Sequence, residues 1–229
     1  MPLTACIAPP AAPSVDGRGP VIDPMSASQL GQTDFNRTVS VAMRDNLNAL
    51  YALAEKLYRR NPSQWRLSGA TSVEDAVARI RRDVLAGAPP VGLSNLRDVQ
   101  VLGVALNPDY PGDRVAAFIY GLADTLIASH NGKTVLYAAD VLDAQRVHNA
   151  ARNVEVAAWM LSTRRDAAGA PLLLANAVSD DVVSLSIERL FGTIIGRVDL
   201  VANLLGENSR RIGIGYAQGL MLFNFLPVR

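Results

Sequence analysis

The sequence contains a single cysteine, two histidines and few aromatic residues, and each scarcity excludes a class of function. One cysteine cannot form a disulfide within the chain, nor supply the several thiolates of a zinc ribbon or metal cluster. Aromatic residues make up 6% of the chain and the formal net charge is +1, unlike a basic, base-stacking nucleic-acid binder. No run of about 18 uncharged apolar residues is present, so no transmembrane helix is predicted.

The sequence also has little that is typical of an active site. No serine has the Gly-x-Ser-x-Gly flanks of a nucleophile elbow. His130 and His148 are not four residues apart on one helix, and no carboxylates have ligand spacing around them. We therefore predict no catalytic residue, no metal site and no cofactor. His130 is expected to be exposed at a helix C-terminus, and His148 to lie on an ordinary polar helix face.

Three glycines near the end of the chain, Gly213, Gly215 and Gly219, have some of the spacing of a dinucleotide-binding fingerprint. That fingerprint must follow a strand and needs an acidic residue about twenty positions further on. No acidic residue follows Gly219, so a cofactor loop is not predicted. Glycines along a helix more often let a neighbouring backbone approach closely. We therefore expect this stretch to cross a preceding helix tightly at Gly192 and Gly196.

The single cysteine, Cys6, ends the stretch Leu3-Thr4-Ala5-Cys6. An aliphatic residue, two small residues and a cysteine resemble the lipobox of bacterial lipoproteins, in which the cysteine is lipidated and becomes the mature N-terminus. Small side chains suit the peptidase groove, and the thiolate is the nucleophile that takes the lipid. The resemblance implies lipidation of Cys6, and Ile7 after it implies the outer membrane. A signal needs a longer apolar run than Met1 to Ala5, so we expect the exported precursor to begin upstream.

The segment from Ile7 to about Thr33 contains five prolines and three glycines. Such a stretch cannot hold a helix, and it has too few large apolar side chains to offset the entropy of ordering it. It is predicted to be a disordered tether, or alternatively an extended strap anchored by Val21, Ile22 and Met25. We accordingly divide the chain into residues 1–33, the lipobox remnant and Pro-rich tether, and residues 34–229, a single helical domain.

From Asp34 onward, apolar residues recur at the three- and four-residue spacings of amphipathic helices. They predict an all-α fold, an irregular bundle of about six to eight helices with up to two short strands. Residues 93–106 fit either a short helix capped by Ser94 or a buried strand, and we favour the helix. Residues 172–178 fit a strand or a buried turn. The predicted helices are 34–60, 71–86, 113–129, 139–162, 180–205 and 208–225.

Several helix ends carry specific signals. Thr33 or Asp34 is predicted to cap the first helix, and Asn61-Pro62 to stop it. Thr71 and Glu74 have the spacing of a capping box, with Gly87 just past the end of that helix. In the long helix that follows Ser179 or Asp180, apolar residues recur at steps of three and four until Gly206, which is predicted to end it.

Two classes of function fit these observations. The first is a lipid-anchored, non-catalytic interaction or structural protein of the bacterial cell envelope, facing the periplasm. Its partners would be the membrane, through Cys6, and an unknown envelope protein or a second copy of the chain, with no nucleic acid. The alternative is an envelope enzyme whose site is assembled from residues distant in sequence.

Overall fold

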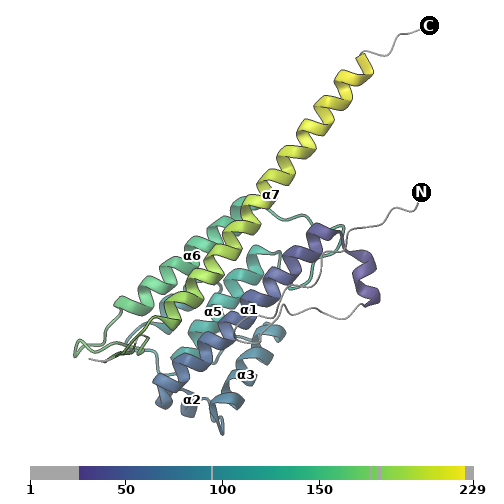
Figure 1. Ribbon diagram of the computed structural model, residues 1–229. Coiled ribbons are helices and arrows are strands. Elements are labelled where there is room, and N and C mark those ends of the chain that lie inside the picture. Colours follow the sequence, from purple (N-terminus) through teal and green to yellow (C-terminus); the bar gives the residue numbers. More distant parts are fainter. Residues whose placement is uncertain (1–25, 94, 176, 180–181, 225–229) are drawn as a thin grey trace, which may run out of the picture. The chain divides into compact units, whose positions relative to one another are not determined.

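The computed structural model describes residues 26–93, 95–175, 177–179 and 182–224 (Figure 1). The chain divides into two units, Met1–Gly31 and Gln32–Arg229. In the first unit, the described residues contain a 3-10 helix, η1 (Ala27–Gly31). Cys6 and nearly all of the predicted tether lie outside the described residues, as does Ser94. Lipidation and the choice between tether and strap therefore stay predictions.

The second unit is all-α, as predicted, with seven helices and one small hairpin among the described residues. The two strands of the hairpin are antiparallel, and Val178 lies opposite Val183. The elements are α1 (Asp34–Arg60), α2 (Pro62–Leu67), α3 (Val73–Ala86), α4 (Val99–Ala105), α5 (Arg114–Ser129), α6 (Ala144–Thr163), β1 (Ala177–Ser179), β2 (Val182–Ser184) and α7 (Ser186–Asn224).

Helix α5 is the centre of the bundle. Its side chains are buried on most sides, and α1, α3, α4 and α6 all pack against it. Phe118, Ile119 and Leu122 have no exposed surface, and burying a side chain of this size stabilises the fold by about 1.5–3 kcal/mol. Phe118 also meets Phe191 of α7 edge to face, with ring centroids 6.5 Å apart. The apolar composition of this helix therefore determines where its neighbours lie.

The first turn of α5 carries a buried charge that the rest of the bundle stabilises. Asp113 caps the helix: one carboxylate oxygen accepts the Ala116 N–H at 3.0 Å. The other accepts the Tyr58 hydroxyl of α1 at 2.7 Å. Burial raises the pKa of Asp113, whereas these hydrogen bonds lower it. The bonds thus offset part of the desolvation of the carboxylate, and they tie α1 to the start of the central helix.

Most of the predicted helix ends are confirmed. The Thr33 hydroxyl accepts the Asn36 N–H at 3.1 Å, and Gly87 closes α3 with a left-handed φ of 62°. The predicted capping box is shifted by one residue, because Ser72 accepts the Asp75 N–H at 3.1 Å and Asp75 in turn accepts the Thr71 N–H at 3.0 Å. Ser72 with Asp75 has the same spacing as Thr71 with Glu74, so the sequence pattern does not distinguish the two.

Two helices begin later than predicted. Helix α6 starts at Ala144 rather than Ala139, because Asp143 accepts the Arg146 N–H at 2.8 Å and caps it there. Val141, which lies before this cap, is 81% exposed. Helix α7 starts at Ser186, since Val183 pairs in the hairpin. Residues 99–105 form a helix, as favoured, and its N-cap is Asp98.

The predicted break at Gly206 is wrong, because α7 continues through it to Asn224. A glycine inside a helix costs only about 0.5–1 kcal/mol relative to alanine. Glu207 binds Arg210 at 2.7 Å and Arg211 at 3.0 Å, at the three- and four-residue spacings that a helical backbone brings together. Within the described residues, no helix is long and apolar enough to cross a membrane.

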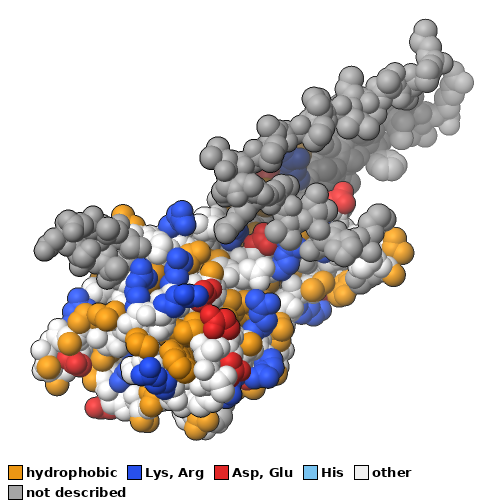
Figure 2. All heavy atoms as spheres, turned by 60° about the horizontal axis from the view of Figure 1, so that its bottom comes forward, with side chains coloured by type: hydrophobic (Ala, Val, Ile, Leu, Met, Phe, Trp, Pro, Cys, Tyr) orange, Lys and Arg blue, Asp and Glu red, His pale blue; other side chains and the backbone are white. Residues whose placement is uncertain are grey.

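On the face that Figure 2 shows, side chains of both charges are interspersed with apolar ones. Arg59 pairs with Glu55 at 2.7 Å, and Arg79 with Asp75 at 3.1 Å. Exposed pairs of this kind each contribute about 0–1 kcal/mol. The mixed signs fit the formal net charge of +1 and the expectation of weak long-range steering.

Gly206 and Gly87 form a matched pair that tests the continuity of α7. A Cβ on Gly206 would meet no atom within 4 Å, so we expect Gly206→Ala to raise the free energy of unfolding by about 0.5–1 kcal/mol. Gly87→Ala should lower it by about 1–2 kcal/mol, because that φ is left-handed. Urea unfolding followed by circular dichroism measures both. A destabilising Gly206→Ala would contradict a continuous helix.

Candidate functional site

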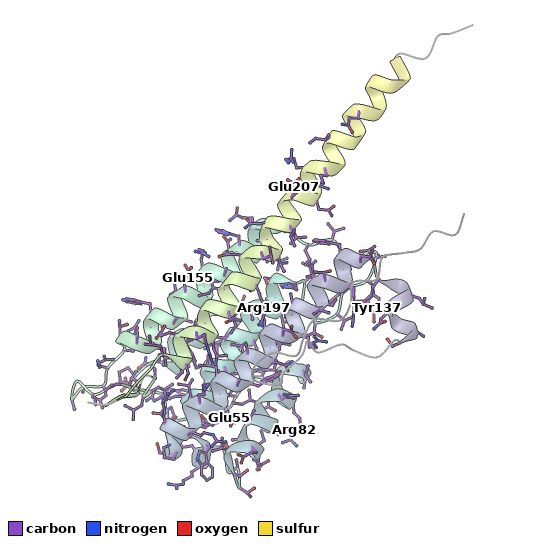
Figure 3. All side chains as sticks on the ribbon, viewed as in Figure 1. Glu55, Arg82, Tyr137, Glu155, Arg197 and Glu207 are labelled. Atoms are coloured by element: carbon purple, nitrogen blue, oxygen red, sulfur yellow. The ribbon has the colours of Figure 1, made fainter. Side chains whose placement is uncertain are left out.

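Helices α6 and α7 lie side by side and antiparallel (Figure 1). A cluster of ion pairs joins them and sets their alignment along the helix axes. The Arg152 guanidinium lies 2.5 Å from one carboxylate oxygen of Asp199, and the His148 ring lies 3.5 Å from the other. Arg152 also pairs with Glu155 at 2.7 Å. Figure 3 labels Glu155 on α6 and Arg197 on α7, where Arg197 donates to the Asp45 carbonyl of α1.

Trp159 projects from the same side of α6 as this cluster. It follows Arg152 and Glu155 at steps of seven and four residues, the spacing of one helix face. The Trp159 side chain is 62% exposed, and the neighbouring Val156 is 52% exposed. Large apolar side chains exposed together on one helix are typical of a contact surface.

Next to Trp159, α7 carries two glycines, and we call the gap left by their missing side chains the notch. Arg152 and Asp199 are paired, so they lie at the same level of the two helices. Seven residues of helix span about 10.5 Å. Trp159, seven residues after Arg152, is therefore level with Gly192, seven residues before Asp199. Both Gly192 and Gly196 are exposed, and a Cβ on either would meet no atom within 4 Å. The predicted tight crossing at these glycines is therefore wrong, because residues 208–224 continue the same helix instead of folding back across it.

The apolar surface continues along α7 at steps of four residues. Leu200 is 57% exposed and Leu204 is 38% exposed. We define the α6–α7 face by the six residues that share this side of the helix pair: Val156, Trp159, Gly192, Gly196, Leu200 and Leu204. A protruding tryptophan and an open notch thus lie beside each other, with the ion cluster between the two helices.

The two histidines differ in environment. His130 is only 3% exposed, and its Nδ1 lies 2.9 Å from the Leu126 carbonyl, to which a protonated Nδ1 would donate. The prediction that it is exposed is wrong, because it ends the central helix and is covered like the rest of that helix. Burial lowers the pKa of His130, so its ring is neutral at pH 7. His148 lies on a polar face as predicted, with 48% of its side chain exposed.

The described residues include no cluster of side chains with the composition of a metal site. No three His, Cys, Asp or Glu side chains of this part of the chain come together as a metal would require. Residues 213–219 lie within α7, so they do not form the strand-to-helix loop of a dinucleotide-binding site. Cys6, the predicted lipidation site, is outside the described residues.

The fold and this surface define an all-α bundle with an exposed apolar face on two antiparallel helices. No family model, no curated protein and no solved structure matches this chain. The chemistry of the residues themselves is therefore the basis for a function.

Sequence reasoning did not single out Trp159, although a signal was present. The predicted inward residues of this helix include Ala158 and Leu161, and a tryptophan between them falls on the polar face. A large aromatic residue on the polar side of an amphipathic helix is a useful sign of an interaction surface, because tryptophan is enriched at such surfaces.

His130 predicts a pH dependence of stability. Because its pKa in the folded state is below the ordinary 6.5, the unfolded chain binds more protons below that pH. Stability present above pH 6.5 is therefore lost as the pH falls through 6.5 toward the folded-state pKa. We expect His130→Asn to remove this part of the pH dependence, measured by urea unfolding between pH 5 and 8. His148→Asn is the matched control, and an unchanged slope in the His130 variant would contradict the prediction.

Proposed function

We propose that this chain is a lipid-anchored, non-catalytic interaction protein of the bacterial cell envelope, held at the outer membrane through Cys6 and facing the periplasm. The observation that carries the proposal is the exposed α6–α7 face, whose largest exposed side chain is Trp159. The lipobox-like stretch Leu3-Thr4-Ala5-Cys6 supports the anchor. A single acyl chain binds only marginally, whereas the three chains of a typical lipoprotein hold firmly at about 0.8 kcal/mol per buried methylene.

The partner that best fits this face is a second copy of the chain. A two-fold contact places a surface against itself, so the surface must be complementary to itself. The α6–α7 face would meet this requirement, since Trp159 is exposed and Gly192 and Gly196 beside it carry no side chains. In a two-fold pair, each tryptophan would enter the notch of the other copy.

The charges near the face are compatible with the same arrangement. Arg152 and His148 lie beside Asp199 and Glu155, so both signs are present within one patch. A patch of a single sign would repel its own copy, whereas a mixed patch lets cations of one copy meet carboxylates of the other. Lipid anchoring favours this contact further, because it confines the copies to one surface and raises their effective concentration.

Lipidation of Cys6 is tested in cells that express the full gene with its upstream sequence. A palmitate analogue should label the wild-type protein, and the labelled protein should sediment with the membrane fraction. Cys6→Ser should lose both the label and the membrane association, because the acceptor thiol is absent. An unlabelled wild-type protein in the cytosol would refute the lipid anchor. It would not contradict self-association through the α6–α7 face.

Self-association is tested by sedimentation of the protein over a range of concentrations. We expect Trp159→Ala to weaken the dimer by about 2 kcal/mol, or roughly 30-fold, as for a central aromatic contact residue. Leu67→Ala is the control, because Leu67 is 59% exposed but lies on α2, away from the face. Gly192→Glu should also weaken the dimer, because its side chain would fill the notch. Residue 192 is exposed, so the monomer should stay folded. A wild-type protein that is monomeric at every concentration would exclude this partner.

A further inference from the structure

A pocket of about 260 Å³ lies between the start of α1, residues 136–142 and the middle of α7. Figure 3 labels Tyr137 in this loop and Glu207 on this part of α7. The apolar residues that line the pocket are Phe35, Leu136, Ala138, Val141, Leu142 and Leu205. Phe35 and Leu142 are half-buried and Val141 is 81% exposed. A ligand can therefore reach apolar carbon on the wall, and hydrocarbon is favoured in such a place.

Three polar side chains of the pocket wall, those of Thr33, Asn36 and Asp140, are bonded within the protein. The Thr33 hydroxyl donates to the Asn36 side-chain oxygen at 2.7 Å, and the Asn36 amide donates to the Tyr137 carbonyl. Asp140 accepts the Tyr137 N–H at 2.8 Å and pairs with Lys133. A polar ligand would lose its hydration and find these groups already occupied, whereas an apolar chain loses no hydrogen bond.

The loop that carries Val141 is held by α1 and by Gln32 just before it. The Leu136 N–H donates to the Ser40 hydroxyl at 2.9 Å, and the Leu136 carbonyl accepts the Gln32 amide at 2.6 Å. Ser40 and Asn36 are buried, at 5% and 7% exposure. Buried polar side chains need a partner, and here the loop backbone is that partner. The pocket is thus formed without a ligand, which lowers the entropy cost of binding one.

The size of the pocket restricts the apolar molecule further. Its volume is below the range of about 300–1,000 Å³ typical of drug-sized ligands, so a slender chain fits and a lipid with two chains does not. On α7, the pocket is lined by Asn208 and Ser209, which are exposed. Their amide and hydroxyl can donate hydrogen bonds to a polar head group that stays in contact with water.

We propose that this pocket binds the hydrocarbon chain of a single-chain lipid, such as a free fatty acid. The chain lies against Phe35, Val141 and Leu142, and the head group lies at Asn208 and Ser209. No residue of the pocket belongs to the α6–α7 face, so the inference does not depend on the proposed anchoring or self-association.

The test is a titration of the full 229-residue chain with octanoate, decanoate and sebacate, followed by two-dimensional NMR of the backbone amides. Decanoate should shift the signals of residues 136, 138, 142 and 205, which line the pocket, and leave Trp159 unmoved. Burial of one methylene is worth about fourfold in affinity, so octanoate, which is two methylenes shorter, should bind about 15-fold more weakly. Sebacate carries a second carboxylate at the far end of the ten-carbon chain. It should bind about tenfold more weakly than decanoate or worse, because that carboxylate would lie among apolar side chains.

Val141→Asn and Val91→Asn form a matched pair, because both valines are exposed and only Val141 lines this pocket. Both variants should keep the thermal midpoint of the wild type. Val141→Asn should weaken decanoate binding by about fivefold, since it removes an apolar side chain from the wall. Val91→Asn should bind decanoate like the wild type.

Sedimentation with phosphatidylglycerol vesicles distinguishes a free lipid from a chain within a bilayer. Co-sedimentation of the unlipidated wild type that Val141→Asn abolishes would assign the pocket to a bilayer lipid and overturn the assignment to a free one. The proposal is also overturned if decanoate moves no pocket resonance, if its shifts centre on Trp159, if sebacate binds as tightly as decanoate, or if the two valine variants bind decanoate alike.

Discussion

The burial of α5 is the constraint on which the rest of the bundle depends. Phe118, Ile119 and Leu122 are withdrawn from solvent, and α1, α3, α4 and α6 pack against the helix that carries them. A central helix must still satisfy the backbone N–H groups of its first turn. Asp113 does so from a buried position, which is tolerable only because the Tyr58 hydroxyl and backbone N–H groups bind the carboxylate. The apolar centre therefore requires one well-satisfied polar junction between α1 and α5.

Helix α7 is bound differently, and this difference creates the candidate docking face. It packs mainly on α1 and α6, with Ile187, Ile194 and Val198 turned inward and Arg197 bonded to the backbone of α1. Its opposite side meets no other helix at Gly192 and Gly196. The exposed Trp159 lies beside this open side. Burial of the inner residues is enough to hold α7, so the outer residues contribute little to the fold and are free to serve contact with another molecule.

The periodicity of apolar residues predicted the helices well, because burial on one face is a property of the sequence itself. Periodicity predicted α1, α5 and the inward residues of α7. Residue type predicted the caps at Thr33 and Gly87. It failed at Gly206, where the helix propensity penalty of a single glycine is too small to end the helix, and at His130, whose burial depends on tertiary position. The hydrogen bond from the Asp98 N–H to Asp124 has no local sequence pattern, since α5 and the loop before α4 meet only in the folded chain.

Tyr58 and Tyr120 show two ways in which this bundle buries a phenol. Both phenols are almost fully buried in the same bundle, at 0% and 2% exposure. Tyr58 donates to Asp113, so its burial is explained by the fold. Tyr120 has no acceptor within the described residues, although a phenylalanine would fill the same volume without a hydroxyl to satisfy. A buried hydroxyl without an acceptor destabilises the fold, whereas the paired hydroxyl of Tyr58 helps to hold α1 against α5.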